Sequence, residues 1–164
     1  MSTIQPRPLP DNALLGEYAR NGAYTDCYAT DVPAAVSHER YVAAFYTTPL
    51  FKLERVILKW AVSKPSTDEQ ARQLAAGSLD TFAAWSVEKR VENQLLLRDF
   101  LGRTRSWLMV APLADEAGVG TRLYFGSAVV PRGKSGSGPP PLLGFHQLYS
   151  RALLRSARVS LRFA

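Results

Sequence analysis

The spacing of hydrophobic residues indicates a strand, then helices, then several strands and finally one long helix. The first strand is predicted at residues 24–31, which alternate with a period of two and are rich in aromatic residues and threonine. Three segments with helical spacing follow, and each opens with residues that favour a helix N-terminus. These openings are Ser37, Thr48-Pro49 and a capping box from Ser66 to Glu69. Short helices are therefore expected after the first strand.

Beyond residue 80 the pattern changes to a period of two, which indicates strands. The four predicted strands are residues 82–90, 95–100, 104–112 and 121–130. Because their connections are short, we expect neighbouring strands to be antiparallel and to form a meander. The longest of these connections is a polar loop predicted at 114–120.

Charged side chains crowd the first three strands of this meander. They are Glu88, Arg90, Arg98, Asp99, Arg103 and Arg105. A two-residue turn at 101–102 would set Arg98 directly opposite Arg105, and like charges in that arrangement would indicate a bound anion. A shifted register would instead bring Asp99 beside an arginine. The simpler interpretation is a solvent-exposed face on which ion pairs form.

The last and longest helical pattern covers residues 142–163, after a loop rich in proline and glycine at 131–144. Its predicted apolar stripe consists of Phe145, Leu148, Tyr149, Ala152, Ser156, Val159 and Phe163. A row of arginines is expected on the other side, facing solvent. This arginine row consists of Arg151, Arg155, Arg158 and Arg162.

Composition and charge agree with one globular domain. The chain has 164 residues, of which 46% are hydrophobic and 21% charged, enough to bury a core. Residues 1–21 are predicted to be a mobile tail with one helical turn, and 22–164 a single domain. Four of the six net positive charges lie in the arginine row. Since no aromatic residue interleaves with it, nucleic-acid binding is disfavoured, and a solvated face or a partner contact is favoured.

Cofactor and metal sites are not expected. Cys27 is the sole cysteine, which excludes an intrachain disulfide, and we expect it to be a small buried apolar residue. His38, expected to face water, and His146 lack the spacing of a zinc site. Glycines at 118–120 fall in a predicted hairpin and do not form a dinucleotide fingerprint. With no long apolar run for a membrane span and no secretory signal at the start, we expect a cytoplasmic protein.

The order of these elements resembles the helix-grip fold of START-like proteins, the superfamily of polyketide cyclases, Bet v 1 and lipid-transfer proteins. The similarity covers about residues 22–163 and is carried by the first strand, the helices from Ser37 and Pro49, and the segments GRTRSWLMV, TRLYFGSAVVP and LLGFHQLYSRALL. It implies an α+β fold in which a curved antiparallel β-sheet wraps around a long C-terminal α-helix. The superfamily has seven strands where the pattern predicts five, which implies a shortened or divergent member.

The resemblance implies a cavity between sheet and helix, and the function expected is binding of a small, largely apolar ligand, with cyclase- or dehydratase-type chemistry as an extension. The expected walls are Trp85, Leu97, Trp107, Phe125, Phe145, Tyr149 and Leu153. His146 and Tyr149 would orient the ligand, and Arg105 would meet a carboxylate or enolate. The same residues would equally form a filled core.

The alternative function is that of a non-catalytic interaction protein. It would present the arginine row or the loop at 131–144 to a partner, or form a homo-oligomer.

Overall fold

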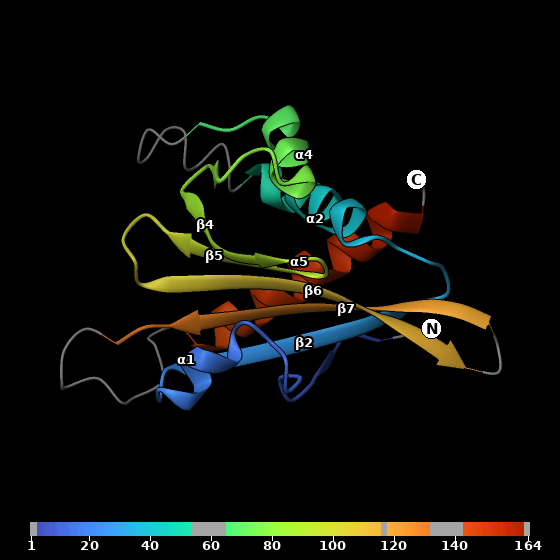
Figure 1. The fold of residues 1–164 in the computed structure, drawn as a ribbon, viewed down its shortest axis with the longest axis horizontal. Helices are drawn as coiled ribbons and strands as arrows, with labels where there is room; N and C mark the ends of the chain where they lie inside the picture. Colours follow the sequence, from blue (N-terminus) through green and yellow to red (C-terminus); the bar gives the residue numbers. More distant parts are fainter. Residues whose placement is uncertain (1–2, 54–64, 116–117, 132–142, 163–164) are drawn as a thin grey trace.

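The centre of the fold is one antiparallel sheet, seen in a computed structural model that describes residues 3–53, 65–115, 118–131 and 143–162 (Figure 1). Its seven strands follow the order β1-β2-β7-β6-β5-β4-β3. Their bounds are β1 Gln5–Pro6, β2 Tyr24–Val32, β3 Thr81–Phe82, β4 Trp85–Val91, β5 Gln94–Asp99, β6 Thr104–Asp115 and β7 Gly118–Val129. Strands β3 to β7 form a meander, and β2 pairs along its whole length with β7. The predicted antiparallel meander is confirmed.

Strand boundaries differ from the prediction in two places. Residues 82–90, predicted as one strand, are divided between β3 and β4, because Ala83 has a φ of 52°, which a continuous strand does not contain. The polar loop predicted at 114–120 is mostly strand, since β6 and β7 remain paired as far as Asp115 and Gly118. With β1 added at the edge of β2, the sheet has seven strands instead of five.

The helices begin close to the predicted positions. They are α1 Gly16–Arg20, α2 His38–Tyr46, α4 Asp68–Ala76 and α5 Leu143–Arg162. Residues 49–53 are also helical, and the rest of the helix predicted from Pro49 lies outside the described residues. The side-chain oxygen of Ser37 caps α2 as predicted, accepting a backbone N–H at 3.1 Å.

The capping box of α4 is one residue later than predicted. It is formed by Thr67 and Gln70 instead of Ser66 and Glu69. Both pairs have the residue types and the spacing of a capping box, so the sequence does not distinguish them. As predicted, α4 ends at Gly77, whose φ of 83° is in the left-handed region that glycine adopts without strain.

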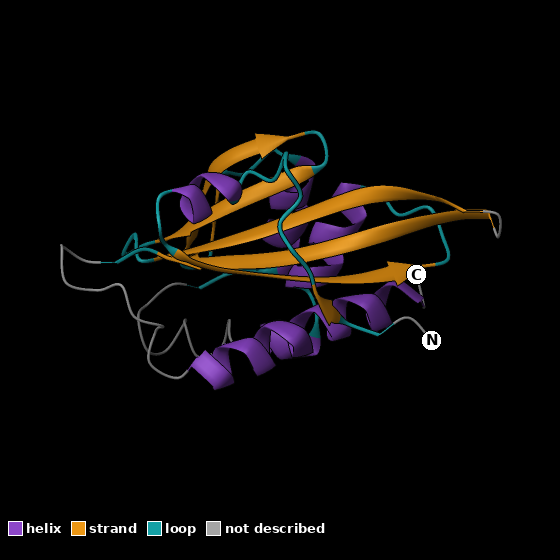
Figure 2. Cartoon of the chain, turned by 90° about the horizontal axis from the view of Figure 1, so that it is seen from below, coloured by secondary structure: helices purple, strands orange, loops and turns teal. Residues whose placement is uncertain are grey.

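Both faces of the sheet are covered. On one face, here called the inner face, α2 and α4 lie over the β3–β6 half and α5 lies over β2 and β7 (Figure 1). The opposite, outer face is covered by the N-terminal segment with α1, and Figure 2 shows α1 and α5 on opposite sides of the sheet. The fold is therefore a mixed α+β arrangement of a helical layer, a sheet and a shorter outer layer.

The described part of the N-terminal segment packs on the sheet, whereas residues 1–21 were predicted to be a tail outside the domain. From Thr3 to Arg20 it lies along the sheet, first as β1 and then as α1. Leu15 is fully buried, and the Leu14 N–H donates to Gln94 Oε1 at 2.9 Å. The few apolar residues of this segment are enough to hold it on the sheet, because they pack against the apolar surface of the outer face.

The buried stripe of α5 is rotated from the predicted one. The residues that face the core are Ser150, Leu153, Leu154, Ala157 and Leu161. By contrast Leu148 is 67% exposed and Val159 45% exposed, although both belonged to the predicted stripe. The helix carries apolar residues on more than one side, so its periodicity alone does not determine which side is buried.

Among the helices within the described ranges, none is long and apolar enough to cross a membrane.

Candidate functional site

A partly open cavity of about 210 Å³ lies on the inner face, bordered by the sheet, α2, the following helical turn and α5. Its lining residues are Phe45, Tyr46, Phe51, Trp85, Thr104, Arg105, Ser106, Phe125, Ser127, Tyr149, Ser150 and Leu153. Most of this surface is aromatic or aliphatic, with hydroxyl groups contributed by the strands and by α5. This composition is typical of small-molecule sites.

The wall contributed by the helices is a connected group of aromatic rings. The ring of Phe45 is centred 4.8 Å from that of Phe125 on β7 and 6.3 Å from that of Phe51. Tyr46 contacts Phe51 edge to face at 4.7 Å. Such edge-to-face and tilted pairs stabilise the arrangement beyond simple burial. The aromatic side of the cavity is therefore held in place by its own packing.

The polar side of the cavity is built from serines. Ser106 on β6 and Ser127 on β7 lie directly opposite each other in the strand register. The Ser127 hydroxyl donates to Asp26 Oδ1 at 2.6 Å, and the Ser127 backbone N–H donates to the same atom at 3.0 Å. The carboxylate of Asp26 therefore lies one hydrogen bond behind the cavity wall.

A tyrosine and a glutamine extend this polar network toward α5. The Tyr24 hydroxyl donates to Asp26 Oδ2 at 3.2 Å and accepts from Gln147 Nε2 at 3.4 Å. Burial raises the pKa of Tyr24, with Asp26 adding to the effect, so its hydroxyl stays protonated and able to donate. The network connects β2, β7 and α5 at one side of the cavity.

Five of the nine predicted site residues line the cavity: Trp85, Arg105, Phe125, Tyr149 and Leu153. Leu97 is fully buried in the inner core but is not part of the cavity lining. The side chains of Phe145 and His146 lie outside the described part of the structure.

Trp107 is on the opposite face of the sheet from the predicted cavity, which corrects that assignment. It packs with Leu15 and Cys27 in the outer cluster, and its indole N–H donates to Gln94 Oε1 at 2.9 Å. Strand alternation separates two sets of residues but does not say which set faces the helix. Because both faces here are covered and apolar, Trp107 fitted either one.

Arg105 borders the cavity, but its side chain lies on the outer face. Its Nε is 2.6 Å from Glu88 Oε2 and donates to the Tyr18 hydroxyl at 2.8 Å. The guanidinium group also lies 4.8 Å from the centre of the Tyr18 ring. Of the two registers considered, the structure has the one with Arg98 directly opposite Arg105. However, Glu88 supplies the negative charge that we expected from a bound anion.

The sequence analysis missed the helical aromatic residues and the serines of the cavity. A signal for the serines exists. On β6 the inward Ser106 precedes Leu108 and Val110, on β7 the inward Ser127 follows Leu123 and Phe125, and the two serines occur at the same register. This signal can be recognised only when the register between β6 and β7 is known, and the sequence alone does not determine that register.

Two further groups are buried away from the cavity. His38 was expected to face water but is only 8% exposed, and its Nε2 is 3.3 Å from the Leu108 carbonyl oxygen. Burial lowers the pKa of His38 to about 4. Cys27 is buried as predicted, and burial raises the pKa of its thiol to about 12, so it is not a ready nucleophile.

The comparisons with known proteins assign no function, so the site is interpreted from its geometry. The sequence matches no family model and no curated protein. Within the described ranges, no group of three or more histidine, cysteine, aspartate and glutamate side chains is placed to hold a metal ion.

Proposed function

We propose that the protein binds a small, largely apolar molecule in the inner cavity, between the sheet and α5. The observation that carries the proposal is an aromatic cavity lined on one side by Ser106 and Ser127, which lie opposite each other in the strand register. The helix-grip assignment is part of the same proposal, since a seven-stranded antiparallel sheet with a C-terminal helix on one face is compatible with it.

The size of the cavity limits the ligand. An engineered cavity of about 150 Å³ holds benzene, whereas drug-sized ligands occupy about 300–1,000 Å³. At about 210 Å³ the cavity is suited to a molecule with one ring or a short branched chain. The serine hydroxyls would favour a ligand that carries one polar group, such as a phenol.

Binding is proposed without a catalytic residue. Cyclase or dehydratase chemistry needs a group that transfers a proton at the cavity. The described lining side chains include no carboxylate or imidazole, and Asp26 is bonded to the lining residue Ser127. The proposal is therefore ligand binding and does not include a catalysed reaction.

The test is calorimetric titration of the full chain with benzene, phenol and acetate, combined with variants that fill the cavity. Leu153→Phe and Ser106→Leu add apolar atoms to two different walls, and each is expected to weaken phenol binding about tenfold or more by removing space. Val159→Phe adds the same ring to an exposed position of α5 and should leave binding unchanged. Phenol binding that survives both fillings, or no binding of either ring compound, would overturn the proposal.

A further inference from the structure

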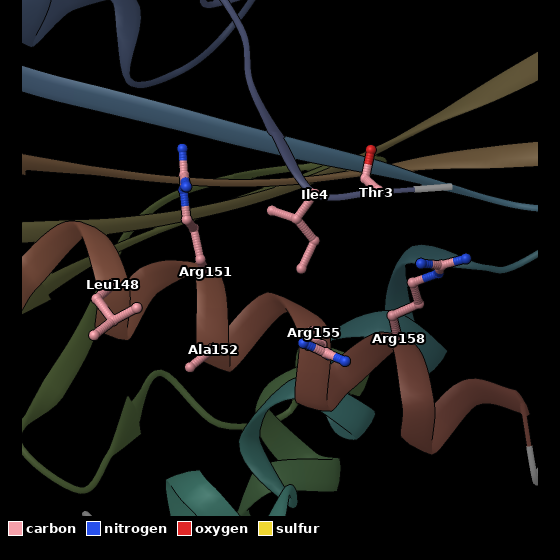
Figure 3. A pocket seen from close by; sticks show the side chains of 7 residues that line it. All are labelled: Thr3, Ile4, Leu148, Arg151, Ala152, Arg155 and Arg158. Carbon is pink, nitrogen blue, oxygen red and sulfur yellow. The ribbon is translucent and has the colours of Figure 1, made fainter. Parts of the chain in front are cut away.

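A second hollow lies on the other side of α5, between that helix and the start of the N-terminal segment. Its volume is about 460 Å³, and it is lined by Thr3, Ile4, Leu148, Arg151, Ala152, Arg155 and Arg158. Figure 3 shows the side chain of Ile4 pointing from the N-terminal segment toward α5, with the three arginines arranged around it. We call this hollow the arginine groove.

Positive charge predominates in and around the groove. None of its described lining residues is acidic. The hollow that adjoins it at Thr3 is lined by Gln5, Arg7, Ala29, Thr30, Asp31 and Arg122 as well, so Asp31 is the single acid among the described linings of both.

Asp31 is already engaged by arginines. Its two carboxylate oxygens accept from Arg122 Nε at 2.7 Å and Nη2 at 2.9 Å, a bidentate pair. Arg122 is the main cause that lowers the pKa of Asp31, and Arg7 and Arg158 add to the lowering at longer range. One carboxylate thus serves three guanidinium groups, which leaves a positive field at the groove.

The groove also exposes apolar surface beside this charge. Leu148 is 67% exposed, and Ala152 follows it by one turn on the same side of α5. Ile4 faces them from the N-terminal segment. A solvated charged helix face does not require such a strip, whereas a ligand with an anionic head and an apolar tail would contact both parts.

We propose that the arginine groove binds a small amphiphilic oxyanion, with its carboxylate or phosphate head on the guanidinium groups of Arg151, Arg155 and Arg158 and its apolar chain on Ile4, Leu148 and Ala152. The volume lies within the range of small-molecule sites, about 300–1,000 Å³. Guanidinium groups bind carboxylate and phosphate oxygens by the same paired N–H donors, so the two head groups share one recognition chemistry.

This site is independent of the inner cavity. The two hollows share no lining residue, because Tyr149, Ser150 and Leu153 face the sheet while Leu148 and Arg155 face the groove. Failure of one proposal therefore leaves the other unaffected.

The test titrates the full chain with octanoate and octyl phosphate, and with acetate and inorganic phosphate as head groups without a chain. Octanoate, octyl phosphate or both should bind about tenfold or more tightly than the matching head group, and the stronger of the two identifies the natural head group. Arg155→Glu should weaken this binding about tenfold or more, and higher salt should weaken it further.

Two other variants separate the parts of the groove. Leu148→Ser should reduce the preference for octanoate over acetate without changing acetate binding. Arg72→Glu reverses an exposed arginine charge on α4 and should have little effect on either. Equal losses for Arg72→Glu and Arg155→Glu, chain and head group binding equally well, or binding only to anionic vesicles would overturn the proposal.

Discussion

The two faces of the sheet both bury aromatic residues but use their polar groups differently. On the outer face the indole N–H of Trp107 is paired with Gln94, and Arg105 is paired with Glu88 and Tyr18. On the inner face the rings leave a cavity into which serine hydroxyls open. The outer polar groups are completed by one another, whereas on the inner face only part of the polar wall is described as paired, through the bond of Ser127 to Asp26, and the wall borders a hollow that can hold a ligand.

Among the variants that test this comparison, the largest loss of stability is expected for a substitution of Trp107. Trp107→Ala removes a fully buried ring from the outer cluster, and we expect a loss of about 3–5 kcal/mol in the free energy of unfolding. Trp85→Ala is the matched variant on the cavity side, and it should cost less because that ring is only partly buried. Urea denaturation measures both. Equal losses would mean that the two faces are packed alike.

The buried ion pair of the outer face is expected to come next. Glu88→Gln leaves the guanidinium of Arg105, whose side chain is 9% exposed, without its negative partner, which should cost about 2–4 kcal/mol. Glu69→Gln removes the acid from an exposed pair with Arg72 and should cost about 0–0.5 kcal/mol. Urea denaturation at neutral pH measures the free energy of unfolding of both variants. Equal stability of the two variants would contradict this expectation.

A pH dependence is expected from the inner face. The pKa of His38 is about 4 in the folded chain and near its ordinary 6.5 when unfolded, so the unfolded state binds more protons between these values. Stability should therefore fall as the pH decreases from about 6.5 to 4, by about 2–3 kcal/mol, and change little from this group above pH 7. Denaturation of His38→Asn across this range should show a shallower fall. Parallel curves for the two proteins would contradict the assignment.

The smallest expected effect concerns the cavity itself. Ser106→Ala removes a hydroxyl from a wall that faces empty volume, so stability should change by less than about 1 kcal/mol. The same variant should reduce the preference for phenol over benzene in calorimetry. A large loss of stability with unchanged preference would show that this hydroxyl has a structural role.

Much of the fold could be predicted from short stretches of sequence that mark where strands and helices begin and end. The strand at residues 24–31, the Ser37 cap and the end of α4 at Gly77 could be predicted, because each depends on neighbouring residues. The Arg98–Arg105 register stayed open between two alternatives until the structure showed it. Five of the nine predicted site residues line one cavity. The serines could not be placed, since they meet only through the pairing of β6 with β7.

The amino-acid sequence by itself determined where most of the strands and helices form, because backbone preferences and hydrophobic period act over a few residues. Only the tertiary structure decided which face of each element is buried. Trp107 and the stripe of α5 illustrate this. Either apolar side of the strand or helix could be buried with a similar gain in free energy, and a segment distant in sequence decides which side is covered. That segment was the N-terminal one, which turned the outer face into a second core and left the inner face to hold the cavity.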